Sequence, residues 1–336
     1  MSAAEPVGAS TGMLSAARRG TVLAAGPLLP FVLALLLAGV VLVATGRDVG
    51  EIFGLLIEHS FGGGVALANT LAQTTPVLLT GLATAFAFRS GVFNIGVEGS
   101  LYVGAFAAAW VGFTFLGVPG PVLLTAAIVL GAVVGAAWAF VPGYLKARWQ
   151  VDEVVTTLML NFVAINLTSY LVNGPFLAVG TANSMSPLVA PQARLGSLAP
   201  PSQMTIGLII ALMLAVGYWF VFRRTTIGYE LRTAGDNPRF AAASGISLFR
   251  VVMVAMLVSG LVAGLAGAFQ ILGVNFRFID RFSPGYGFTG IAVALLGRNT
   301  AIGCVLAALF FGALSSGGAT IQLFTNIPLD LIDLLV

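Results

Sequence analysis

Polar side chains inside long apolar runs are the residues of this sequence best placed to do chemistry. Five of them are neutral amides and one is a carboxylate. Polar groups in a hydrocarbon environment are costly unless they face a cavity or a protein partner. Amides hydrogen bond to neutral polar solutes, whereas carriers driven by protons or sodium more often need buried acids or histidines. The predicted solute-pathway residues are Asn69, Gln73, Asn94, Glu98, Asn161 and Gln270.

Glu98 is the one acid in this set, and it stands among Gly91, Gly96 and Gly99 at the start of an apolar run. Glycines at this density loosen a helix and let another backbone approach closely. Two interpretations of the carboxylate stay open. Either it lines a broken helix that faces inward, or it forms an ion pair with Arg89 that only anchors the helix at the membrane interface.

The sequence lacks the sets of residues that ATP hydrolysis by a P-loop, zinc binding and enzyme catalysis would need. Lys146, the only lysine, is followed by Ala147, so the sequence contains no G-K-[ST] phosphate loop. His59 and Cys304 are each the only residue of their type, which excludes a zinc site built from them and a disulfide framework. No nucleophile–base–acid set stands out. We therefore expect no enzyme activity and no cofactor in this chain, and energy from ATP would have to come from another subunit.

The elements that hold these residues must be membrane helices. Hydrophobic residues make up 58% of the 336 residues, charged residues only 8%, and the mean hydropathy is +1.02. Soluble domains carry about 25% charged residues, and too few charges exist here to cover a soluble core. The net charge of +3 comes without a basic stripe interleaved with aromatics, so a nucleic-acid partner is not expected. The composition predicts an all-α, polytopic integral membrane protein.

Hydropathy predicts about nine spans or broken spans. We expect a tail at residues 1–20, a single membrane domain at 21–336 and an external loop at 173–202. Residues 285–297 and 301–316 are short for a bilayer, the pattern of discontinuous helices that line a pathway. Residues 331–336 look like the start of a truncated tenth span. The predicted spans are 21–44, 65–88, 90–115, 119–141, 154–172, 204–222, 251–273, 285–297 and 301–316.

The charges predict the orientation of these spans. Eleven of the 15 cations fall on segments assigned to one side and four on the other, which by the positive-inside rule places the N-terminus in the cytoplasm. The richest cytoplasmic segment is a polar island at residues 223–250, between two spans. Within it Asn237 and Pro238 predict the start of a short helix, with Asn as the N-cap, and Gly245 predicts its end. Without further information this island is also compatible with an ordinary basic loop.

Three strings of residues carry a resemblance to a known family. Residues 228–246 contain G-x-E-L-R-x-x-G-x-N-P-x-x-A-x-x-x-G-I, residues 88–100 read FRSGVFNIGVEGS, and residues 144–161 read YLKARWQVDEVVTTLMLN. The first resembles the cytoplasmic coupling loop of permeases of ATP-binding-cassette (ABC) importers. All three are similar to the branch of these importers that carries branched-chain amino acids, simple sugars and nucleosides, and most similar to its nucleoside-type permeases. The likeness covers residues 76–328, most of the chain.

The resemblance implies that the island transmits the movement of a separate ATPase. In that reading the glycines shape the segment and the polar residues contact the ATPase. The implied coupling residues are Gly228, Glu230, Arg232, Gly235, Asn237, Pro238, Arg239 and Gly245.

The resemblance also implies partners and a location. The partners are a second permease subunit, ATPase subunits that bind ATP and Mg²⁺, and an extracytoplasmic substrate-binding protein or lipoprotein. The location is the bacterial plasma membrane, and the expected cargo is a neutral polar solute such as a nucleoside or a simple sugar. The alternative class is a secondary transporter driven by an ion gradient, which would work without an ATPase.

Overall fold

The computed structural model describes residues 36, 39–40, 43 and 48–324, with side chains up to residue 319. The predicted tail, nearly all of the predicted first span and the possible tenth span lie outside the described residues. The described chain is helical and contains two isolated β-bridges but no strand. Its elements are α3 (Val49–Phe61), α4 (Gly64–Arg89), α5 (Val97–Thr114), α6 (Gly120–Trp149), α7 (Glu153–Asn173), η1 (Pro191–Ala193), α8 (Gly207–Arg224), α9 (Thr226–Asp236), α10 (Pro238–Ala243), α11 (Leu248–Gln270), η2 (Ile271–Asn275), α12 (Tyr286–Leu296) and α13 (Ala301–Phe324).

Six helices among the described residues are long and apolar enough to cross a membrane, namely α4, α6, α7, α8, α11 with its π-helical end η2, and α13. The protein is therefore a multi-pass membrane protein. The predicted spans at α5 and α12 are also helices, of 18 and 11 residues, but they fall outside this group. The main compact unit runs from Glu58 to Gly317 and contains α4 to α12 whole.

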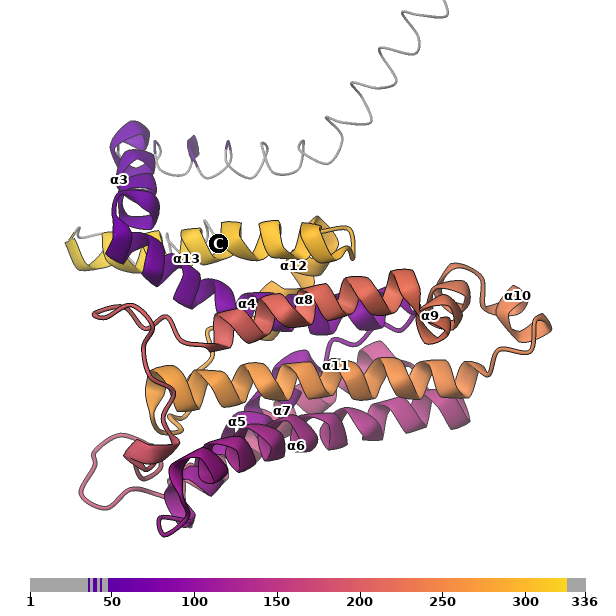
Figure 1. Cartoon of the computed structure of the whole chain (residues 1–336), viewed down its shortest axis with the longest axis horizontal. Coiled ribbons are helices and arrows are strands. Elements are labelled where there is room, and N and C mark those ends of the chain that lie inside the picture. The colour runs from indigo at the N-terminus through magenta and orange to yellow at the C-terminus, as the bar shows by residue number, and fades with distance from the viewer. Residues whose placement is uncertain (1–35, 37–38, 41–42, 44–47, 325–336) are drawn as a thin grey trace, which may run out of the picture. The chain divides into compact units, whose positions relative to one another are not determined.

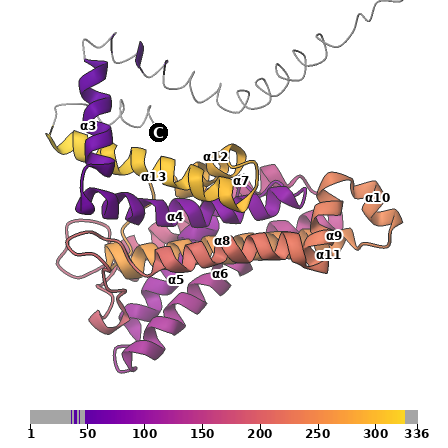
Figure 2. The same cartoon turned by 45° about the horizontal axis from the view of Figure 1, so that its top comes forward.

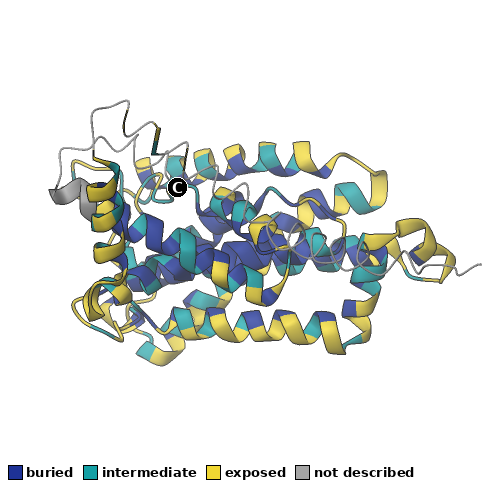
Figure 3. Ribbon diagram, turned by 90° about the horizontal axis from the view of Figure 1, so that it is seen from above, coloured by how far each residue is buried: buried dark blue, intermediate teal, exposed yellow. Residues whose placement is uncertain are grey.

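Glycine-lined contacts hold the centre of this unit together. A Cβ on Gly264 of α11 would lie 2.3 Å from the carbonyl oxygen of Gly131 of α6, and one on Gly104 of α5 would lie 2.5 Å from the Cα of Gly264. Backbones can approach this closely only where side chains are absent. Gly131 and Gly135 of α6, four residues apart, therefore serve in helix packing, as do Gly260 and Gly264 of α11. Figure 3 shows the buried residues gathered inside the bundle and the exposed ones on its outer faces.

The long helices of the main unit run between two ends (Figure 1), and the cations are unequally divided between these ends. We call the end where α4, α6 and α8 finish and α7, α11 and α13 begin the basic end. It carries nine of the described cations, Arg89, Lys146, Arg148, Arg223, Arg224, Arg232, Arg239, Arg250 and Arg298. The opposite end carries Arg194, Arg277 and Arg281, together with the proline-rich segment between α7 and α8, which is irregular as expected.

The structure corrects three expectations about elements. The predicted short span at 301–316 is the first part of α13, which continues through the Ser-Ser-Gly-Gly stretch to Phe324. The predicted span at 119–141 continues as α6 to Trp149, with Pro142 inside the helix. The island is not a loop with one short helix, because it also contains α9. The break between α12 and α13 is confirmed.

Candidate functional site

At the basic end α9 lies past the end of α8, and α10 projects beyond the ends of both α8 and α11, in both views of the chain (Figures 1 and 2). Thr225 begins α9 as its N-cap, because its hydroxyl accepts a hydrogen bond from the backbone N–H of Gly228 at 3.0 Å. The buried residues of α9 are Gly228, Leu231 and Ala234, at the spacing of one helix face. That spacing is the signal from which the helix was predictable, and our sequence interpretation missed it.

Two of the predicted glycines let α9 lie directly on other backbones. A Cβ on Gly228 would fall 1.9 Å from the carbonyl oxygen of Val221 in α8. A Cβ on Gly235 would fall 2.4 Å from the carbonyl oxygen of Arg89, and one on Gly91 would fall 2.9 Å from the Cα of Gly235. The motif at 228–246 therefore packs against the motif at 88–100, although the two are far apart in the sequence.

The short helix α10 is built as expected. The Asn237 side chain accepts from the N–H of Phe240 at 3.0 Å, Pro238 occupies the first helical position, and Gly245 ends the turn with φ at +81°. Asn237 and Arg239 are exposed, so they are available to a partner. Glu230 and Arg232 on α9 are only partly exposed.

Asn94 and Asn161 hold the link between α4 and α5. The Asn94 amide nitrogen donates to the Ser259 hydroxyl at 2.9 Å, and its oxygen accepts from the N–H of Gly96 at 2.8 Å. Both side chains are almost completely buried. Buried amides with both ends paired fix a backbone conformation, so these two residues determine the shape of the link.

Asn161 reaches the same link from α7. Its amide oxygen accepts from the N–H of Gly99 at 2.8 Å, and its nitrogen donates to the carbonyl of Ile95 at 2.9 Å. The helix carrying Asn161 starts beside an ion pair between Lys146 and Glu153, whose charged atoms are 2.7 Å apart. The string at 144–161 is thus joined to the string at 88–100.

Glu98 holds the first turn of α12. The carboxylate of Glu98, a residue that is 2% exposed, accepts a hydrogen bond from the N–H of Gly287, and the Ser283 side chain lies beside it. The first N–H groups of a helix have no partner within the helix, and a carboxylate there is favoured by the helix dipole. The interpretation of Glu98 as an interfacial partner of Arg89 is wrong, because the carboxylate is buried against α12. Ser283, which also accepts from the N–H of Tyr286 at 3.1 Å, was missed from the sequence.

Gln73 also contacts the first turn of α12, whereas the last two predicted pathway residues, Asn69 and Gln270, do not. The Tyr286 hydroxyl donates to the Gln73 side chain at 3.3 Å. Asn69 is exposed near the start of α4. Gln270 lines a cavity of about 10 Å³ beside Thr75, room for about one water molecule. Four of the six residues thus gather around the α4–α5 link and the start of α12.

Comparison with known proteins is informative over most of the chain. Residues 66–335 match the family described as the permease component of the branched-chain amino acid transport system. The chain belongs to this family. The match includes every described helix from α5 to α12 and nearly all of α4. Family members of this kind are transport components, so the packed polar residues above belong to a permease.

The permease has close relatives among curated proteins. It is 38% identical over 315 residues to the guanosine ABC transporter permease protein of Bacillus subtilis, covering 92% of this chain and 90% of that protein. It is 36% identical to the glucose ABC transporter permease protein of Haloferax volcanii, covering 92% and 84%. It is 32% identical to a nucleoside ABC transporter permease protein of Lactococcus lactis, covering 87% and 82%. No solved structure matches the permease.

Proposed function

We propose that this permease is the membrane subunit of an ABC importer and that its cargo is a nucleoside, with a simple sugar as the other possibility within the same class. The observation that carries the proposal is the similarity to nucleoside permeases over nearly the whole length of both proteins. The similarity to a glucose permease supports a simple sugar as the alternative cargo.

The α9–α10 projection is the proposed docking surface for the ATPase. Besides the exposed polar residues Asn237 and Arg239, it presents three large apolar side chains, Ile227, Tyr229 and Phe240, each more than half exposed. Exposed apolar groups beside a cation are typical of a protein interface. The sequence interpretation named only polar contacts, and the structure adds these three. The remaining implied residues, Gly228, Glu230, Arg232, Gly235, Pro238 and Gly245, would shape and support the projection.

A mechanical route from this projection to the membrane helices follows from the contacts. The projection rests on the α4–α5 link through Gly235 and Gly91. The link is fixed by Asn94 and Asn161, and a few residues later Glu98 holds the first turn of α12. A displacement of α9 by an ATPase would therefore be passed to the start of α12, where Gln73 and Tyr286 also meet.

The solute pathway is proposed to be completed by a second permease subunit. Two cavities of the described chain, of about 450 and 370 Å³, are lined by none of the six predicted pathway residues. Two copies of related subunits facing each other would place a pathway between them. Separate subunits would bind ATP and Mg²⁺, and an extracytoplasmic binding protein or lipoprotein would deliver the solute.

The membrane arrangement we propose has the basic end in the cytoplasm of a bacterial cell, with the chain in the plasma membrane. The positive-inside rule supports this orientation, because the cations concentrate at the end that bears α9 and α10. An even number of crossings would separate the N-terminus from this end, so the N-terminus is also cytoplasmic. The single domain at 21–336 would then contain about nine full or broken spans.

Uptake by cells tests the cargo. A strain that lacks this permease is compared with the same strain carrying it, using radiolabelled guanosine, cytidine and glucose. We expect the permease to restore nucleoside uptake, and an excess of unlabelled nucleoside to compete while glucose does not. Restored glucose uptake without nucleoside uptake would replace the nucleoside by the sugar, and restoration of neither would contradict the proposal.

A further inference from the structure

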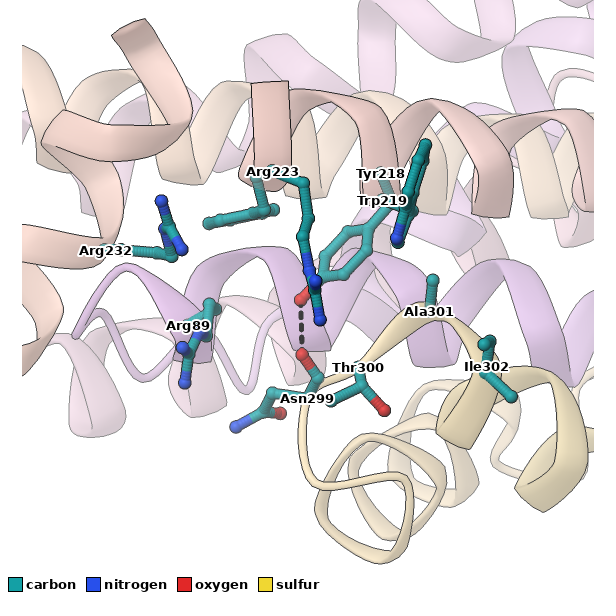
Figure 4. A pocket seen from close by; sticks show the side chains of 10 residues that line it. Arg89, Tyr218, Trp219, Arg223, Arg232, Asn299, Thr300, Ala301 and Ile302 are labelled. Atoms are coloured by element: carbon teal, nitrogen blue, oxygen red, sulfur yellow. Dashed lines mark hydrogen bonds between the residues drawn. The ribbon is translucent and has the colours of Figure 1, made fainter. Parts of the chain in front are cut away.

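A second feature of the basic end is a cavity of about 450 Å³ between α4, α8, α9 and the link that joins α12 to α13. Arginine side chains from three different helices, Arg89, Arg223 and Arg232, point into it (Figure 4). The Tyr218 hydroxyl lines the same space and donates to the backbone carbonyl of Asn299 at 2.6 Å. None of the lining residues is acidic.

Among the described residues, no carboxylate forms an ion pair with the three arginines of this cavity. The described chain has an ion pair between Lys146 and Glu153, which lies outside the cavity and does not involve the three arginines. The Nε atom of Arg232 and the side-chain oxygen of Asn299 are buried without a hydrogen-bond partner. Three guanidinium groups around one cavity repel one another unless an anion lies between them. The cavity therefore has the chemistry of an anion site.

The start of α13 also favours an anion in this cavity. The helix begins at Ala301, and both Ala301 and Ile302 line the cavity. The first N–H groups of a helix lack partners within the helix and carry a partial positive charge. Phosphate groups bind well at such a position. The arginines and the helix start thus point to the same kind of ligand.

An apolar groove of about 370 Å³ continues from the cavity between α8 and α13. The cavity and the groove share Trp219, Ala301 and Ile302. The groove then follows α8 back to Leu212 and α13 onward to Leu306, in both cases away from the basic end. From Trp219 to Leu212 the distance along the helix is about 10 Å. Its lining is entirely apolar, being Leu212, Ala215, Val216, Trp219, Ala301, Ile302, Val305 and Leu306.

We propose that the cavity and the groove together bind one anionic phospholipid. The headgroup phosphate lies among Arg89, Arg223 and Arg232 at the start of α13, and an acyl chain lies in the groove between α8 and α13. A soluble anion would satisfy the arginines but leave the groove empty. A zwitterionic headgroup would bring its own cation to a site that already has three. The lipid would touch α9 through Arg232, and the proposal does not depend on which solute the permease carries.

Native mass spectrometry of the detergent-purified importer tests the site with defined probes. Dioleoylphosphatidylglycerol, dioleoylphosphatidylcholine and inorganic phosphate are titrated separately. We expect phosphatidylglycerol to be retained at one site per permease in preference to phosphatidylcholine, and phosphate not to displace it. Equal retention of the two lipids would overturn the proposal. Displacement by phosphate would show a site for soluble anions and would overturn the lipid assignment.

Substitutions localise the binding. Each of Arg89→Gln, Arg223→Gln and Arg232→Gln should weaken retention of phosphatidylglycerol roughly fivefold, and the triple variant on the order of a hundredfold. Arg223→Lys should retain most of the binding, since the charge is kept. The matched controls are Arg224→Gln and Arg250→Gln, exposed at the same end but outside the cavity. Because the triple variant can misfold, the single variants decide the outcome by themselves, and controls that weaken binding as much as they do would refute the site.

A second pair of variants tests the groove. Val216 lines it, whereas Met213 on the same helix is equally exposed and does not. Val216→Asn should weaken binding of dioleoylphosphatidylglycerol several-fold more than Met213→Asn does. Neither should affect the short-chain dihexanoylphosphatidylglycerol, whose chains are too short to fill the groove. Equal effects of the two variants on the long-chain lipid would mean that no acyl chain lies there.

Discussion

The buried side chains around Glu98 act on backbone rather than on one another. Asn94, Asn161 and Glu98 all accept from backbone N–H groups at places where a helix is interrupted or begins. Their importance was predictable from the sequence, because a polar group in an apolar run needs a partner. Their partners were not predictable, since Gly287 and Ser259 lie more than 160 positions away. The contribution of these residues to a solute pathway stays a proposal.

Glu98 gives the first prediction. Glu98→Ala leaves the buried N–H of Gly287 without an acceptor and should lower the free energy of unfolding by about 1–3 kcal/mol. Glu98→Gln keeps an oxygen acceptor and loses the charge at the start of α12, so its effect should be smaller. Thermal unfolding of the purified permease measures both, with the exposed Asp236→Ala as the control. An unchanged melting temperature in Glu98→Ala would contradict this role.

The helices were predictable where one uninterrupted run of apolar residues is long enough to span the bilayer. They were less predictable where glycines or polar residues interrupt the run. The breaks around α12 followed from length, and the start of α10 followed from Asn237 and Pro238. The extension of α13 through Gly317 and Gly318 was not predicted, because small residues end a helix in water but are tolerated in one packed among other helices. The packing of α9 on Gly91 has no local signal in the sequence.

Glycine contacts between α6 and α11 give the second prediction. Gly264→Val places methyl groups where the carbonyl oxygen of Gly131 already lies, and should lower the free energy of unfolding by about 1–3 kcal/mol or prevent folding. Gly217→Val on α8 is the matched control, because no atom lies within 4 Å of the position of its Cβ. Expression level and melting temperature report the difference. Equal tolerance of the two valines would show that the helices do not pack as described.

The exposed aromatic on α10 gives the third prediction. Phe240→Ala should weaken association of the permease with its ATPase roughly tenfold, since aromatic anchors dominate the affinity of many interfaces. Phe115→Ala, an exposed phenylalanine that follows α5 at the opposite end, should leave the association unchanged. Co-purification at graded detergent and salt concentrations, followed by a titration, measures both. Loss of association in Phe115→Ala, or none in Phe240→Ala, would refute the docking surface.

At the scale of the whole molecule, the charge asymmetry connects the sequence with the fold. The cations predicted to share one face are scattered from Arg89 to Arg298 in the sequence, and the described ones lie at one end of the main unit. The arginine-lined cavity within that end was not predictable, because it needs side chains from three helices that only the fold brings together. The family was predictable from three short strings, and the comparisons confirm it.

Orientation gives the fourth prediction. Single cysteines replace the exposed Arg239 on α10 and the exposed Gln192 at the opposite end, in a background where the buried Cys304 is changed to Ala. A membrane-impermeant thiol reagent should label Gln192→Cys in intact spheroplasts. It should label Arg239→Cys only after the membrane is opened. The reverse pattern would place the basic end outside the cell.

The dependence of uptake on a partner ATPase tests the central claim most directly. The importer is reconstituted in proteoliposomes with its binding protein, using either the intact ATPase or a variant that binds ATP without hydrolysing it. The account predicts that nucleoside uptake requires ATP, stops with the hydrolysis-deficient ATPase, and continues when ionophores collapse proton and sodium gradients. Uptake that persists with the inactive ATPase and stops with the ionophores would show a carrier driven by an ion gradient and would contradict the account.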